Sequence, residues 1–135
     1  MASRMIERTQ ARVRETVAGE LAAGEEIEVL LFGITRLNFW LDVLISPLLS
    51  FFQRMWYVVL TDQRVVLVRL NRWSGRPAGI EWIEPRAGVR VDRYGPGKLL
   101  GKLYLRRVSN GSELKLRFNF RNRTEAFAVK TALGD

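Results

Sequence analysis

Between residues 27 and 120 the chain contains about seven short runs of β-branched, aromatic and aliphatic residues, separated by turn-forming residues. The runs at 55–60 and 65–70 are joined by residues 61–64 and indicate a hairpin. No helix-length segment separates successive runs, which argues against alternating strands and helices. The chain is therefore predicted to be mainly β, an antiparallel barrel or sandwich. Further strands are predicted at residues 27–34, 80–83, 89–94, 98–108 and 113–120.

Helices are predicted only at the two ends of the chain. Residues 3–23 have Ser3 as a helix cap and Gly24 as a terminator, and they contain a narrow apolar stripe. This helix packs either on its own domain or against a partner. Residues 122–125 form a capping-box sequence that begins a closing helix, which stops at Gly134. The predicted organisation is an N-terminal helix (1–23) followed by one domain (24–135).

The composition removes most enzymatic chemistry. A chain of 135 residues has the size of one domain, and it contains no cysteine and no histidine. Disulfides, thiolate nucleophiles, imidazole bases and Cys/His metal sites are therefore excluded. The carboxylates and hydroxyls that remain are not arranged for catalysis. We expect a non-enzymatic binding module with no catalytic residues, metal or cofactor.

The segment 57–68, YVVLTDQRVVLV, resembles the aromatic-x-x-(Leu/Val)-Thr-Asp/Asn-x-Arg signature of bacterial pleckstrin-homology-like (PH-like) domains, which are relatives of GRAM domains. The resemblance implies a bent seven-stranded antiparallel barrel closed by the last helix and used as a binding scaffold. It implies no particular ligand. From the residues themselves, Thr61 and Asp62 are expected to bond the turn backbone, and Arg64 to pair with Asp62.

An apolar insertion at residues 37–52 follows the first predicted strand. It is too short to span a bilayer, and Asp42 and Pro47 interrupt it. Only Arg36 is cationic in this region, which does not support a phosphoinositide site of the eukaryotic PH type. Three roles remain open for the insertion. It dips into a bilayer, it contacts a second copy or a partner protein, or it folds over the barrel mouth as part of the core. Its predicted contact residues are Phe39, Trp40, Leu48, Leu49, Phe51 and Phe52.

The formal net charge of +8 is concentrated in one part of the sequence. Residues 86–123 carry eleven cations and two anions, whereas the rest of the chain sums to −1. Strand alternation places Leu114, Leu116, Phe118 and Phe120 on an inner face and Lys115 and Arg117 on an outer one. Like charges on neighbouring strands disfavour folding. The predominance of positive charge in residues 86–123 therefore favours an anionic partner. The predicted binding residues are Arg90, Lys98, Lys102, Arg106, Arg107, Lys115, Arg117 and Arg121.

Three partners are compatible with these features. An anionic lipid surface is expected first, because a cationic face and an apolar insertion together supply two signals for peripheral membrane binding. Nucleic acid is expected less, because only Tyr104, with Tyr94 as a second candidate, remains for base stacking. The third is a protein partner or a second copy bound through the insertion. The N-terminal residues lack a signal peptide, so a cytoplasmic location is expected, with the inner face of the membrane as the surface available.

Overall fold

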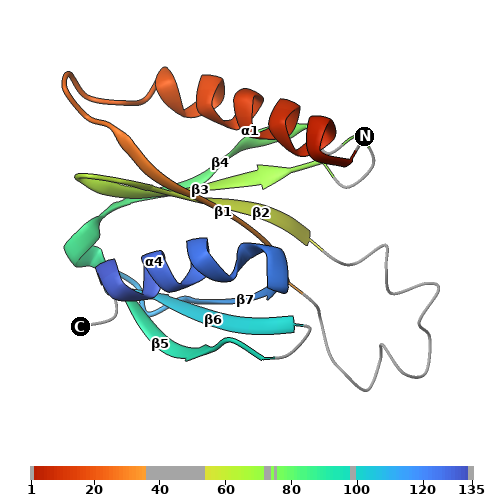
Figure 1. The fold of residues 1–135 in the computed structure, drawn as a ribbon. Helices are drawn as coiled ribbons and strands as arrows, with labels where there is room; N and C mark the ends of the chain where they lie inside the picture. The colour runs from red at the N-terminus through yellow and green to blue at the C-terminus, as the bar shows by residue number, and fades with distance from the viewer. Residues whose placement is uncertain (1, 36–53, 72–73, 75, 98–99, 134–135) are drawn as a thin grey trace.

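The computed structural model describes residues 2–35, 54–71, 74, 76–97 and 100–133 (Figure 1). It confirms seven antiparallel strands with a helix at each end. The elements are α1 (Ala2–Ala18), β1 (Ile27–Thr35), β2 (Arg54–Thr61), β3 (Arg64–Leu70), β4 (Pro77–Pro85), the 3-10 turn η2 (Arg86–Gly88), β5 (Val89–Gly95), β6 (Leu100–Arg107), β7 (Glu113–Asn119), the 3-10 turn η3 (Phe120–Asn122) and α4 (Arg123–Leu133).

The strands form one open sheet in the order β4-β3-β2-β1-β7-β6-β5. The seven antiparallel strands are as expected, but the sheet does not close into a barrel, because β4 and β5 are its two edges and do not pair with each other. The two halves of the sheet meet where β1 pairs with β7; among the described residues, Ile34 lies opposite Arg117 in this pairing. The sheet bends where these halves meet, so that they face each other (Figure 1).

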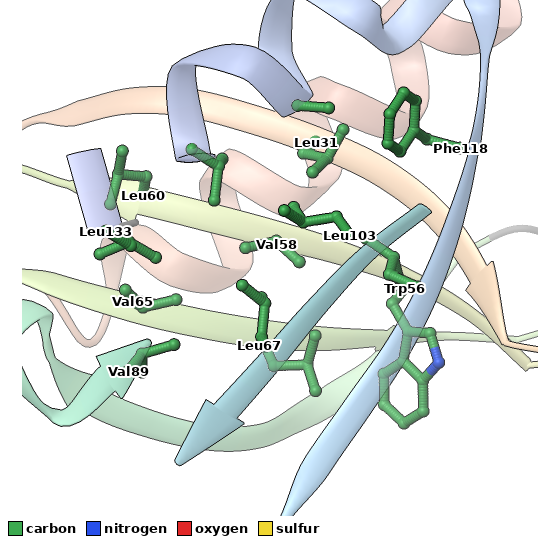
Figure 2. Packing of buried hydrophobic residues seen from close by; sticks show 14 residues of the cluster. Leu31, Trp56, Val58, Leu60, Val65, Leu67, Val89, Leu103, Phe118 and Leu133 are labelled. Atoms are coloured by element: carbon green, nitrogen blue, oxygen red, sulfur yellow. The ribbon is translucent and has the colours of Figure 1, made fainter. Parts of the chain in front are cut away.

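The main core lies between these two halves and α4 (Figure 2). Leu31, Val58 and Leu67 come from one half, and Leu103 and Phe118 from the other. The buried face of α4 closes the core with Ala126, Val129 and Leu133. The prediction that Leu114, Leu116 and Phe118 of β7 face inward is confirmed, and Leu103 and Leu105 of β6 are buried beside them. Phe120 was placed wrongly, because the strand ends at Asn119 and the Phe120 side chain is 56% exposed on η3.

Strands β1 to β4 form one half of the sheet, and helix α1 packs on the face of this half that points away from the main core. Val13 and Val17 are fully buried there, against Tyr57, Val59 and Val66. Packing of α1 on its own domain is thus the alternative that the structure supports. The middle strands β2 and β3 are covered on both faces, which explains why their sequences are almost continuously apolar. The helix ends at Ala18, earlier than the predicted residue 23, because Gly19 is a poor helix former.

A buried ion pair locks the start of β1 to the β2–β3 turn. The side chain of Glu25 is fully buried, and Arg64 donates to both of its carboxylate oxygens at 2.6 and 3.1 Å. The hydroxyl of Thr61 donates to the same carboxylate at 2.5 Å. These bonds, led by that from Arg64, lower the pKa of Glu25 from 4.5 to about 2, against the opposing effect of burial. Arg64 therefore pairs with Glu25. The pairing with Asp62 that the sequence suggested is wrong.

Asp62 completes this lock through the backbone. Its carboxylate accepts a hydrogen bond from Glu26 N at 3.0 Å, and its own amide donates to the Glu26 carbonyl at 3.0 Å. Thr61 Oγ1 accepts from the amide of Arg64 at 2.8 Å, which confirms its expected role in the turn. The two sequence segments 24–26 and 61–64 therefore meet in space.

Replacing Gly101 with alanine is expected to destabilise the fold by about 1–3 kcal/mol, because a Cβ at this buried position would overlap the ring of Phe118 and the carbonyl of Pro96. Urea unfolding measures the effect. Gly19→Ala is the matched control, since nothing lies within 4 Å of the Cβ it would add. Equal stability of the Gly101 variant and the wild type would show that β6 packs less closely on Phe118 than described.

Candidate functional site

A cationic surface covers the outer side of β5, β6 and β7. Helix α1 covers the outer side of the other half of the sheet, and α4 packs into the inner core. Among the described elements, neither helix therefore covers the outer side of β5 to β7 (Figure 1). We call this surface the basic face; it consists of Arg90, Arg93, Lys102, Tyr104, Arg106, Lys115 and Arg117.

Strand pairing places these side chains side by side. Lys102 lies opposite Arg117, and Tyr104 lies between Arg93 on β5 and Lys115 on β7. Arg90 lies opposite Arg106. Like charges directly opposite each other disfavour folding by a few tenths of a kcal/mol per pair or more. An arrangement that brings cations together at this cost is suited to binding an anion.

Among the described residues, acidic side chains neutralise only one of the six cations of the basic face. Arg106 pairs with Asp92 at 2.6 Å and more loosely with Glu113 at 3.6 Å. Within the described part of the chain, no carboxylate pairs with the other five cations. The charge available to a partner is therefore carried by Arg90, Arg93, Lys102, Lys115 and Arg117.

Tyr104 lies at the centre of the basic face. Arg117 Nη2 donates to the Tyr104 hydroxyl at 3.3 Å, and the Arg117 guanidinium carbon lies 5.8 Å from the ring centroid. Lys115 Nζ is also 5.8 Å from that centroid. These cation–π contacts hold the two charges over the ring. The ring is thus engaged by cations, which makes it a poor platform for stacking a nucleobase.

Arg107 does not belong to the basic face, although the sequence placed it there. It shares the inward direction of Leu103 and Leu105, and its Nε and Nη2 donate to Glu84 Oε1 at 3.1 and 3.0 Å. Its guanidinium carbon also lies 5.3 Å from the Trp82 ring centroid. Arg107 therefore joins β6 to β4 across the bend of the sheet. The alternation along β6 contained this signal, because odd-numbered residues of the strand face inward.

Arg121 also lies outside the basic face, because it follows the end of β7. The chain leaves β7 at Asn119, whose side chain accepts a hydrogen bond from Arg121 N at 3.0 Å. The guanidinium carbon of Arg121 lies 5.9 Å from the centroid of the exposed Phe120 ring. Of the predicted binding residues, Arg90, Lys102, Arg106, Lys115 and Arg117 come together on the basic face. Lys98 lies outside the described residues, as do the insertion residues Phe39, Trp40, Leu48, Leu49, Phe51 and Phe52.

Arg93 is the cation of the basic face that the sequence-based prediction left out. Simple alternation from Val89 and Val91 would turn Arg93 inward, but the register between β5 and β6 shifts between Val91 and Arg93. The extra residue of this bulge, Asp92, restores an outward direction for Arg93. Tyr94, considered as an exposed aromatic residue, instead faces the core, with its ring stacked on Phe118 at 6.3 Å.

The remaining chemistry of the described residues is limited. They contain no cluster of three or more acidic side chains that could hold a metal ion. In the same part of the chain, every helix is too short or too polar to cross a bilayer.

Comparison with known proteins finds no matching family model, no matching curated protein and no matching solved structure. The fold class and the basic face therefore rest on the chain's own sequence and geometry.

Proposed function

We propose that this protein is a non-enzymatic module of PH-like type that binds anionic membrane surfaces through the basic face. The observation that carries the proposal is a set of five cations, without carboxylate partners among the described residues, on one open side of the sheet. Each cation near an anionic leaflet contributes on the order of 1 kcal/mol. Five such residues facing one surface suffice for reversible recruitment.

Support for the PH-like type comes from the way the signature residues are used. The bent antiparallel sheet with a C-terminal helix agrees with the expected architecture apart from its open edges. Thr61, Asp62 and Arg64 of the signature contact Glu25 and Glu26 ahead of β1. The resemblance in sequence thus coincides with a specific buried contact.

Two exposed apolar side chains favour a lipid surface over nucleic acid. Leu100 is 45% exposed at the start of β6, where it pairs with Asn119 and shares the outward direction of Lys102. Phe120 follows Asn119 directly and is 56% exposed. Apolar side chains at the border of a cationic surface gain free energy in a bilayer interface and gain little from phosphates alone.

Reversing two charges of the basic face tests the proposal. Lys115→Glu combined with Arg117→Glu is expected to weaken binding to vesicles of phosphatidylglycerol and phosphatidylcholine at least about 30-fold, since each residue contributes about 1 kcal/mol. Arg69→Glu combined with Arg76→Glu is the matched control. It produces the same net charge from two exposed residues in the other half of the protein, Arg69 on β3 and Arg76 immediately before β4. Co-sedimentation at several salt concentrations measures binding, and circular dichroism checks folding.

Three outcomes would contradict the proposal. The first is that the wild-type protein fails to bind anionic vesicles. The second is that the control pair loses as much affinity as the basic-face pair. The third is that duplex DNA, at equal phosphate concentration, binds more tightly than vesicles. The last result would assign the face to nucleic acid.

Self-association through the insertion at residues 37–52 stays a separate prediction, and analytical ultracentrifugation tests it.

A further inference from the structure

We infer that a hollow beside the basic face takes part of a single apolar chain from an anionic amphiphile. The inference rests on the proposed function and names the lipid feature that the protein reads besides charge. The hollow has a volume of about 230 Å³ and lies between α1, strands β1 to β3 and the end of β7. Its lining residues include Ile6, Phe32, Met55, Tyr57, Asn119 and Arg121.

The floor of the hollow is apolar. Phe32 of β1 and Tyr57 of β2 pack with their ring centroids 5.5 Å apart, and Met55 and Leu70 extend the same surface. Helix α1 forms the opposite wall with Ile6, Thr9 and Gln10, of which Ile6 is apolar and 43% exposed. Val13 and Val17 seal the helix against the sheet further along, but the start of α1 leaves this hollow beside it. Tyr57 and Leu70 are buried beneath the hollow, so its apolar surface open to water comes from Phe32, Met55 and Ile6. Such surface in a concave site favours an apolar occupant.

One rim of the hollow is polar and cationic. It is formed by Asn119 at the end of β7 and by Arg121 and Asn122 of η3. The Arg121 guanidinium contacts the Phe120 ring, and no carboxylate of the described residues pairs with it. A cation at the mouth of an apolar hollow is complementary to a molecule with an anionic head and an apolar chain.

The hollow adjoins the basic face. Arg117 pairs with Ile34, and Ile34 faces the same side of β1 as Phe32 in the floor. Asn119 of the rim lies two residues beyond Arg117 and faces the same side of β7. A headgroup held by Arg121 at the rim therefore lies at the border of the basic face, and its chain extends into the hollow.

The size of the hollow limits its occupant. Pockets that enclose a drug-sized ligand measure about 300–1,000 Å³, so this hollow is too small for a whole lipid. It fits a segment of one chain, with the remainder of the molecule in the bilayer. The basic face would then bind charge, whereas the hollow would distinguish an amphiphile from a phosphate without an apolar chain.

A soluble amphiphile separates this inference from vesicle binding. Dodecyl phosphate below its micelle concentration is titrated into the full chain, and the methyl signals of Ile6 and Met55 are followed by NMR. Saturable binding is expected, with shifts at both methyl groups. Inorganic phosphate tests the head alone, and dodecyltrimethylammonium tests the same chain with a cationic head. Both are expected to bind at least about tenfold more weakly, because each lacks one of the two contacts.

Two exposed positions provide the variants. Ile6→Glu is expected to weaken dodecyl phosphate binding at least about tenfold, because it places a charge where the apolar chain would cover it. Arg121→Glu is expected to weaken binding by at least the same factor, because it removes the cation at the rim. Val108→Glu is the matched control, because Val108 is 53% exposed and does not line the hollow. It is expected to bind like the wild type. Arg121→Glu keeps the test decisive should Ile6→Glu unfold.

The outcomes distinguish the two proposals. Vesicle binding without dodecyl phosphate binding would overturn the hollow and leave the basic face standing. Absence of both would overturn both. Equal binding of the cationic amphiphile, or unchanged binding in both Ile6→Glu and Arg121→Glu, would also overturn the inference.

Discussion

Replacing Glu25 with glutamine is expected to lower the free energy of unfolding by about 3 kcal/mol at pH 7. Glu25 is buried, and its pKa is lowered to about 2 by the hydrogen bonds from Arg64 and Thr61. Removing its charge leaves Arg64 without a counterion at a partly buried position, which weakens the connection between the start of β1 and the β2–β3 turn. Urea unfolding measures the loss.

The same residue predicts a particular pH dependence. In the unfolded chain Glu25 titrates near its ordinary pKa of 4.5, whereas in the fold its pKa is about 2. Its stabilising contribution is therefore complete above pH 4.5 and is lost as the pH falls towards 2. The difference in stability between wild type and Glu25→Gln should shrink to less than about half its neutral value by pH 3.

Glu26→Gln is the control for this experiment. The side chain of Glu26 is exposed, and its bonds with Asp62 run through the Glu26 backbone. Its stability should stay within about 0.5 kcal/mol of the wild type. A Glu25→Gln variant as stable as Glu26→Gln, or a difference that does not change between pH 7 and pH 3, would contradict the ion-pair lock.

Replacing Phe118 with alanine is expected to destabilise the protein by about 3–5 kcal/mol. Phe118 is almost completely buried in the core between the two halves of the sheet, and its ring stacks on Tyr94. Its removal leaves a cavity in the core between the two halves of the bent sheet (Figure 2). Thermal and urea unfolding, both followed by circular dichroism, measure the effect.

Phe120→Ala is a demanding control, because the same side chain is removed two residues further along the chain. Phe120 is exposed, so the loss should stay near 0.5 kcal/mol or less. This pair of variants also separates the observed chain path from the one that simple alternation predicts. Similar losses at both positions would show that β7 continues inward through Phe120.

The strands of this protein were largely predictable from sequence, because strand signals are local. The β2–β3 and β6–β7 hairpins were predicted from their turn residues, and the structure confirms that both strand pairs form. The inward direction of Leu116 and Phe118 follows from the twofold period of a strand. The errors lie where that period stops, at Phe120 after the end of β7 and at Arg93 after the bulge.

The candidate site was predictable only in part. The single sign of the charge between residues 86 and 123 pointed to β5, β6 and β7. Sequence could not show that Arg106 is neutralised by Asp92, because that pair forms across strands and depends on the bulge. It also could not show the hollow, which combines the start of α1 with the middle of the sheet and the end of β7.

By itself the sequence determined the number and type of elements, the two hairpins and the concentration of positive charge, since each depends on residues close together in the chain. The tertiary structure alone decided that the sheet stays open, that α1 covers one half of its outer side, and that Arg64 pairs with Glu25. These features depend on contacts between residues far apart in sequence, where packing and burial select one partner among several of similar chemistry. The same selection leaves five cations without carboxylate partners among the described residues of the basic face and brings a hollow to its border.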